Sequence, residues 1–218
     1  MSDVNGGRPR RRYRSPVREE GARRTRQAIV SAAGELFVDR GYVATSLADV
    51  AAAAGVARPT VFAAFGSKPA LLRHVLDQAL AGDDAPVAVA DRPWFKPVWD
   101  ATTPGAVLDA YAEVCLVIAR RAAPLFEAVR RAAEHGPEVA DLWNTLQSNR
   151  RAGAAMIIGH IRTVGDLAPG LANETAIDTL WIFNDPSHYT ALVKQRGWSE
   201  RAYRNWLANR MQDALLPR

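Results

Sequence analysis

The chain begins with a run of arginines whose spacing suits the binding of a polyanion. Residues 1–18 hold six arginines and a single acidic residue, so the whole formal net charge of +5 lies in this segment. Each guanidinium that neutralises a phosphate releases condensed counterions, and the intervening glycines and prolines leave little apolar surface to fold. We predict an arm, residues 1–22, that is disordered when free and contacts DNA, with a merely solubilising tail as the alternative. The arginines expected to meet DNA are Arg8, Arg10, Arg11, Arg12 and Arg14.

Residues that could support catalysis or bind a metal are scattered along the chain. The sequence contains no HExxH pattern, no Cys/His cluster, no GxSxG elbow and no glycine-rich phosphate loop. Carboxylates at i, i+4, such as Asp109 and Glu113, are typical of solvated helix faces. We therefore expect no enzyme activity, no cofactor and no metal.

The single cysteine and the absence of long apolar runs bear on the compartment. Cys115 cannot form an internal disulfide, which fits a reducing environment, and its apolar setting in YAEVCLVIA favours an inert, buried thiol. No apolar run approaches the roughly 18 residues of a membrane span, and the arginine-rich N-terminus lacks the apolar segment of a signal peptide. We expect a cytoplasmic protein that does not enter a membrane.

Helical periodicity dominates from Thr25 onward. Apolar residues recur at helical spacing in four segments that start near Thr25, Leu47, Arg58 and Lys68. The second and third segments are short, and the turn between them contains Gly55. This pattern is typical of a helix-turn-helix, and the many alanines make the helices thin enough for a major groove about 12 Å wide. A helical hairpin used only for packing gives the same spacing, so it stays open at this point.

The order of these segments carries a family resemblance. The stretch TRQAIVSAAGELFVDRGYVATSLADVAAAAGVARPTVFAAFGSKPALL resembles the N-terminal domain of the TetR family of bacterial transcriptional regulators, through its paired alanines, its GY and TS dipeptides, the AGV turn and the closing SK. The resemblance implies an all-α protein with a helix-turn-helix domain at residues 23–81. It also implies a larger helical domain, residues 82–218, that binds an unidentified small-molecule effector and forms a homodimer.

The resemblance further implies which side chains contact double-stranded DNA. Phe62 stands where a tyrosine is usual and lacks its hydroxyl, and Ala57 replaces a frequent serine N-cap at a cost of about 1 kcal/mol to the helix end. We expect the arginine arm to compensate. Arg58 matches a position that reads a base or grips a phosphate, and both roles stay open. The implied contacts are Thr45 and Ser46 on phosphates, Arg58, Pro59, Thr60, Phe62 and Ala63 along the recognition helix, and Lys68 on the DNA backbone.

The remainder of the sequence reads as a connection followed by further helices. Residues 82–105 are rich in proline and acidic side chains and predict a connection. Pro124 then predicts a break between two helices, and Ser199 is the expected N-cap of the last helix. The expected helices cover about 105–122, 124–135, 137–164, 173–184 and 186–197, with a last helix after Ser199.

Two further sets of residues follow from the resemblance, although ordinary core residues look the same. The effector is expected to contact Tyr111, Cys115, Trp143, Met156 and Trp181, and the dimer interface is expected to include Tyr203, Trp206, Leu207 and Met211.

The sequence thus favours a DNA-binding regulator, specifically a ligand-responsive repressor that binds a palindromic operator as a homodimer. The alternative is an architectural DNA-binding protein that depends on its arm and has no strong sequence preference.

Overall fold

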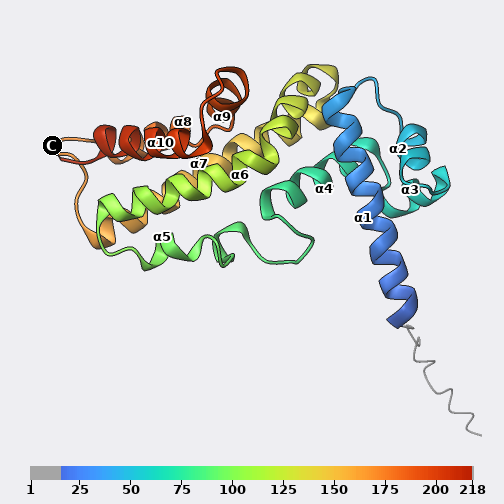
Figure 1. The fold of residues 1–218 in the computed structure, drawn as a ribbon, viewed down its shortest axis with the longest axis horizontal. Helices are drawn as coiled ribbons and strands as arrows, with labels where there is room; N and C mark the ends of the chain where they lie inside the picture. The colour runs from blue at the N-terminus through green and yellow to red at the C-terminus, as the bar shows by residue number, and fades with distance from the viewer. Residues whose placement is uncertain (1–15, 218) are drawn as a thin grey trace, which may run out of the picture.

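The computed structural model describes residues 16–217, which are built from helices and their connections (Figure 1). The all-α fold class is confirmed. The first four helices are α1 (Pro16–Asp39), α2 (Leu47–Ala53), α3 (Arg58–Phe65) and α4 (Lys68–Ala81). The later elements are η1 (Val89–Asp91), α5 (Lys96–Asp100), α6 (Pro104–Ala132), η2 (Ala133–His135), α7 (Pro137–Val164), α8 (Asn173–Phe183), α9 (Ser187–Tyr189), η3 (Thr190–Gln195) and α10 (Glu200–Leu215).

The long helices α6 and α7 form the middle of the molecule. Figure 1 shows α1, α2 and α3 gathered at one end of this pair and α8 and α10 packed along the other end. α4 lies between the two groups and packs against both α1 and α6. The helix-turn-helix therefore lies at one end of the molecule, and both α4 and α1 contact α6.

α1 begins earlier than the sequence pattern predicts. The helix starts at Pro16, so residues 16–22, assigned to the arm from their composition, are helical. Proline is favoured in the first turn of a helix, and Glu20 pairs with Arg23 (3.1 Å) and Arg24 (3.8 Å) at i, i+3 and i, i+4. Charge pairs rather than an apolar stripe support this part of α1, which is why hydrophobic periodicity missed it. The arm arginines up to Arg14 lie outside the described residues.

The predicted break at Pro124 is wrong. α6 runs continuously through this residue, although proline removes one backbone hydrogen bond and crowds the preceding turn. Its neighbours Ala123, Leu125 and Phe126 are buried, so packing on both sides holds the helix together. Tertiary contacts here outweigh the local cost of the proline.

The two remaining differences concern short elements. The connection 82–105 contains η1 and α5, and Phe95 and Trp99 stack within it at 5.1 Å between ring centres. The helix predicted over 186–197 is instead one α-helical turn, α9, followed by the π-helical segment η3. The helices predicted over 137–164, 173–184 and after Ser199 are confirmed as α7, α8 and α10.

The apolar core is not divided at residue 81. One buried cluster contains residues of α1, α2, α3 and α4 together with side chains from α6 and α7, including Phe126, Leu142 and Leu146. A second cluster joins α6, α7, α8 and α10. The first four helices therefore share their core with the ends of the two central helices.

The apolar stripe of α10 packs inside this chain rather than outward. Tyr203, Leu207 and Met211 are at most 1% exposed, and α10 makes its main contacts with α6. Trp206 is partly buried and stacks on Tyr203 at 6.1 Å. Placing Tyr203, Leu207 and Met211 at a dimer interface is therefore wrong, because a partner cannot reach side chains that their own chain covers.

Candidate nucleic-acid interface and ligand cavity

α2 and α3 have the geometry of a helix-turn-helix. The chain turns by 110° between them, within the range of about 90–120° typical of this motif. Gly55 adopts a φ of +66°, a left-handed conformation that favours glycine, and the amide of Val56 then donates to the carbonyl of Ala51 at 3.0 Å. Val50 and Val61 are fully buried between the helices. A helical hairpin used only for packing does not explain why the side chains on the outer face of α3 are exposed.

The outer face of α3 is open to solvent along its length. Val61 and Phe65 point into the core, whereas the residues expected to meet DNA are exposed, and Phe62 is 62% exposed despite its apolar ring. The N-cap Ala57 provides no side-chain hydrogen bond to the helix end, as the sequence predicted. The exposed set is Arg58, Pro59, Thr60, Phe62 and Ala63.

Ser46 forms a capping box at the start of α2. Its hydroxyl accepts from the amide of Asp49 at 3.1 Å, and the Asp49 carboxylate accepts from the Ser46 amide at 2.8 Å and from its hydroxyl at 2.6 Å. These bonds from Ser46, helped by the nearby Arg40, lower the pKa of Asp49. Ser46 is exposed as expected, but its hydroxyl is already engaged with an anionic neighbour.

Thr45 differs from the role expected of its side chain. It is 1% exposed, and its hydroxyl donates to the carbonyl oxygens of Gly41 at 2.9 Å and Leu36 at 3.2 Å. The hydroxyl therefore ties the turn before α2 to the end of α1 and does not face solvent. A phosphate contact by this hydroxyl is not available in this conformation.

Lys68 joins the start of α4 to the same turn. Its Nζ donates to the Thr45 carbonyl at 2.7 Å and lies 4.1 Å from the centre of the Tyr42 ring. Burial lowers the pKa of this ammonium group. Lys68 thus positions α2 relative to α4, in addition to supplying a positive charge beside the helix-turn-helix.

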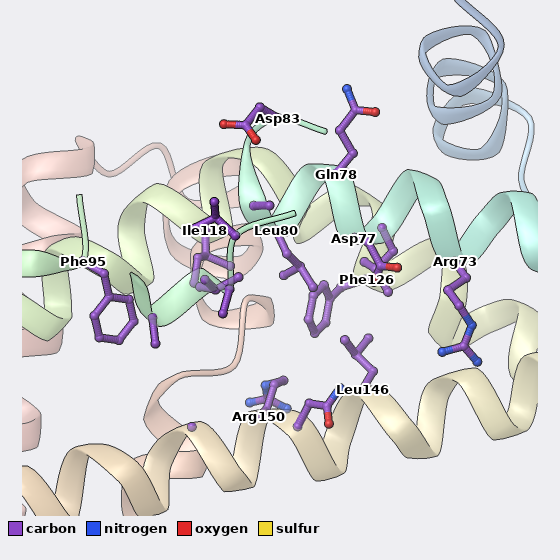
Figure 2. Close-up of a pocket in the computed structure, with 18 of the residues that line it drawn as sticks. Arg73, Asp77, Gln78, Leu80, Asp83, Phe95, Ile118, Phe126, Leu146 and Arg150 are labelled. Carbon is purple, nitrogen blue, oxygen red and sulfur yellow. The ribbon is translucent and has the colours of Figure 1, made fainter. Parts of the chain in front are cut away.

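A cavity of about 920 Å³ lies where α1, α4, α6 and α7 meet. Figure 2 shows Leu80, Phe126 and Leu146 in its middle, with Arg73 toward one end and Phe95 toward the other. Ligand pockets of small molecules measure about 300–1,000 Å³ and are mostly apolar with a few polar groups. The size and lining of this cavity match such a site.

Three of the five residues expected at the effector site line the cavity. Tyr111, Cys115 and Met156 do so, whereas Trp143 and Trp181 do not. Trp143 packs edge-on against Phe126 at 6.5 Å, and the Trp181 ring lies 5.6 Å from the Arg150 guanidinium. Near Trp143, other positions of α7, such as Leu142 and Leu146, face the cavity, whereas no residue of α8 lines it.

A polar group at the cavity wall was not predicted from the sequence. Arg150, whose side chain is 9% exposed, pairs with Asp185 at 2.9 Å and donates to the Trp181 carbonyl and the Asn184 side chain, each at 2.9 Å. Asn184 in turn donates to the Tyr111 hydroxyl at 3.1 Å. Burial raises the pKa of Tyr111 and raises that of Cys115 to about 12, so both are neutral near pH 7. This network joins α6, α7 and the end of α8.

The segment 83–90 closes one side of the cavity. Arg92 is 5% exposed and holds this segment: it binds both carboxylate oxygens of Asp83 at 2.6 and 2.7 Å and donates to the carbonyls of Ala85 and Val87. A single buried guanidinium thus organises the loop.

Arg26, also missed from the sequence, contacts both the cavity and α3. It lines the cavity, donates to the Ala64 carbonyl of α3 at 2.8 Å, and lies 4.3 Å from the centre of the Phe65 ring. Its second amino group is 2.9 Å from Nε2 of His74 on α4. No sequence pattern separates Arg26 or Arg150 from surface arginines; only their contacts do.

Metal ligands and membrane-spanning helices are absent from the described part of the chain. Within residues 16–217, no group of three or more His, Cys, Asp or Glu side chains could hold a metal ion. No single helix in that range is long and apolar enough to cross a membrane; α2 and α3 would meet the requirement only as a bent pair.

Comparison with known proteins shows which families and structures this architecture resembles. Residues 29–75 match the family model described as bacterial regulatory proteins, tetR family. The HTH-type transcriptional repressor ComR of Escherichia coli (strain K12) is 47% identical over 53 residues, which are 24% of this chain and 25% of that protein. The chain thus matches about a quarter of the length of this curated relative.

Solved structures extend the likeness of the fold to nearly the whole chain. A transcriptional regulator from Saccharomonospora viridis, solved in complex with choline, gives a TM-score of 0.68 at 20% identity and covers 92% of this chain and 100% of its own. NalD, the secondary repressor of the MexAB-OprM multidrug efflux pump in Pseudomonas aeruginosa, gives 0.67 at 21% identity, covering 90% and 98%. The helix-turn-helix region, residues 29–75, thus matches the tetR family of bacterial regulatory proteins, and the solved structures share the all-helical fold of nearly the whole chain.

Proposed function

We propose that this protein is a sequence-specific regulator that binds a palindromic operator as a homodimer and, acting as a repressor, releases it when a small molecule occupies the cavity. The observation that carries the proposal is the solvent-open face of α3, held at a fixed angle to α2 at one end of the molecule. TetR-family regulators are transcription factors rather than enzymes, which agrees with a sequence free of catalytic motifs.

The proposed DNA contacts divide into reading and positioning. Arg58, Thr60 and Ala63 lie on the exposed side of α3, where they can reach base edges in a major groove. Ser46 and Lys68 flank α3 and support phosphate contacts, which orient the protein without reading sequence. Phe62 contributes an exposed ring but no hydrogen bond.

Dimerisation follows from how such a motif reads DNA. Two recognition helices related by a two-fold axis require half-sites about one helical turn apart. Since the apolar stripe of α10 is buried in its own chain, we propose that the partner packs on other faces of the C-terminal helices. Sedimentation without DNA is expected to show a dimer, and a stable monomer at micromolar concentration would contradict this part of the proposal.

Substitutions test the two kinds of DNA contact. On operator DNA recovered by selection from random sequences, Arg58→Ala should weaken binding and, where its side chain meets a base, relax the preference at one base pair by about 1–3 kcal/mol. Lys68→Ala should weaken binding to all sequences alike. A change of base preference caused by Lys68→Ala would refute its assignment to the DNA backbone.

A cavity-filling substitution tests the ligand site. A Cβ at Gly153, which lines the cavity from α7, meets no atom within 4 Å, so Gly153→Phe should fill the space without disturbing the backbone. The variant should keep operator affinity and lose both the binding of N-phenyl-1-naphthylamine, a neutral apolar dye, and any release of DNA by small molecules. Unchanged dye binding in Gly153→Phe would place the ligand elsewhere.

A further inference from the structure

Arg26 is a half-buried arginine whose contacts are all with neutral groups. Its guanidinium bonds to the Ala64 carbonyl and to His74 and lies over the Phe65 ring, and no carboxylate of the described residues pairs with it. Burying a charge without an opposite charge is unfavourable, so such a group usually has an anionic partner. Arg26 lacks that partner in this structure.

Other arginines removed from solvent do have carboxylate partners. Arg92 pairs with Asp83 at 2.6 Å, Arg150 with Asp185 at 2.9 Å, and Arg204 with Asp109 at 2.6 Å. Two carboxylates that line the cavity with Arg26, those of Asp77 and Asp84, form no ion pair with it. Asp84 accepts from Gln27 at 3.1 Å and lies 3.9 Å from Arg23, and Asp77 makes no hydrogen bond with Arg26. Arg26 is therefore the exception among these arginines.

Two arginines and a histidine lie together at this end of the cavity. Arg26, Arg73 and His74 line the cavity together where α1 meets α4. The remainder of the cavity is mainly apolar, with Leu80, Phe126 and Leu146 in its middle (Figure 2). Asp84 is exposed to solvent, so water and salt screen its repulsion of an anion, and burial raises the pKa of Asp77, which favours the neutral form of that carboxyl.

We propose that the cavity binds an apolar molecule bearing one anionic group, and that this group binds the Arg26 guanidinium in competition with the Ala64 carbonyl. The inference rests on the proposed function, because it names the chemical class of the effector. A guanidinium bonds more strongly to an anionic carboxylate, sulfonate or phenolate than to a neutral backbone carbonyl, because both partners are then charged. The Arg26 guanidinium therefore bonds to the anion in place of the Ala64 carbonyl of the recognition helix.

The consequence for DNA binding follows from the position of Ala64. It lies in the last turn of α3, one residue before Phe65, and the Arg26 bond fixes this end of the recognition helix to α1. When the guanidinium turns to the ligand, α3 loses that attachment. Coupling between two binding sites is reciprocal. Bound operator should therefore lower the affinity of the protein for the anion by the same factor by which the anion lowers its affinity for the operator.

Two dyes with one skeleton isolate the anionic group. 8-Anilinonaphthalene-1-sulfonate carries a sulfonate on the ring system that N-phenyl-1-naphthylamine presents without charge. Fluorescence titration of the whole protein should show that Arg26→Gln raises the Kd of the sulfonate about tenfold or more and changes that of the neutral dye less than about twofold. Arg24→Gln, an identical change on the exposed side of the same helix, should alter neither Kd.

A second measurement connects the dye to DNA. The sulfonate should lower the affinity of the wild-type protein for its selected operator more than the neutral dye does, and Arg26→Gln should abolish this difference. Arg26→Lys, which keeps the charge, should retain part of it. Retained binding of the neutral dye shows in the same experiment that Arg26→Gln is folded.

The outcomes separate this inference from the function on which it rests. Binding of both dyes to the wild type with equal loss, or no loss, in Arg26→Gln overturns the anionic class and leaves the cavity as a ligand site. Binding of neither dye contradicts the ligand-responsive function and this inference together.

Discussion

Replacing Leu207 with alanine tests whether the α10 stripe is core or dimer interface. Leu207 is 0% exposed within a single chain and packs in the cluster that joins α10 to α6. Removing a fully buried leucine side chain costs about 2–5 kcal/mol in the free energy of unfolding, from reduced burial and the cavity left behind. For a protein of this size, 1 kcal/mol corresponds to about 2–4 °C in Tm, so the expected decrease is about 4–20 °C.

Thermal unfolding followed by circular dichroism measures this effect, and sedimentation measures the dimer. Asn209→Ala, on the exposed side of the same helix, is the matched control and should change stability by less than about 0.5 kcal/mol. We expect Leu207→Ala to lower Tm while the folded protein sediments like the wild type. A Tm equal to that of Asn209→Ala, together with a weaker dimer, would refute the placement of this stripe in the core.

Three further predictions concern the helix cap, the thiol and the arm. Ala57→Ser should supply the missing N-cap of α3. Because Pro59 has no N–H group to donate to the new hydroxyl, we expect the free energy of unfolding in urea to rise by only about 0.5–1 kcal/mol. Ala52→Ser, at an exposed position of α2, is the control and should give no increase. Because burial raises the pKa of Cys115 to about 12, its reaction with a disulfide reagent at pH 8 should be roughly 100-fold or more slower in the native protein than in urea. Deleting residues 2–18 should weaken specific and non-specific DNA binding together and flatten the dependence of log affinity on log salt by about 0.9 for each phosphate that the arm no longer neutralises; an unchanged slope would show that the arm does not meet DNA.

Local signals predicted the helix-turn-helix well because its features are local. The Ser46 cap, the left-handed Gly55 and the apolar spacing of Val50 and Val61 each act over a few residues, and the structure shows each of them. The same reasoning placed the ends of α7 and α8 within a residue and the start of α10 directly after Ser199. Capping and periodicity are sufficient where a helix begins and ends by its own chemistry.

The errors arise where tertiary contacts decide. Packing around Pro124 keeps α6 continuous, and burial of Thr45 turns a supposed phosphate ligand inward. The roles of Arg26 and Arg150 depend on partners 38 and 34 residues away in the chain, Ala64 and Asn184, which no periodicity reveals. An apolar stripe on α10 likewise does not say whether its partner is the same chain or a second one.

Selection of binding sites from a pool of random DNA tests the central claim most directly, that the exposed face of α3 reads sequence as part of a dimer. We predict enrichment of an inverted repeat whose half-sites are centred about 34 Å apart, or a multiple of one helical turn, and its disappearance when Arg58 and Thr60 are both replaced by alanine. Binding that yields no enriched sequence would contradict this account and favour an architectural protein held to DNA by its arginine arm.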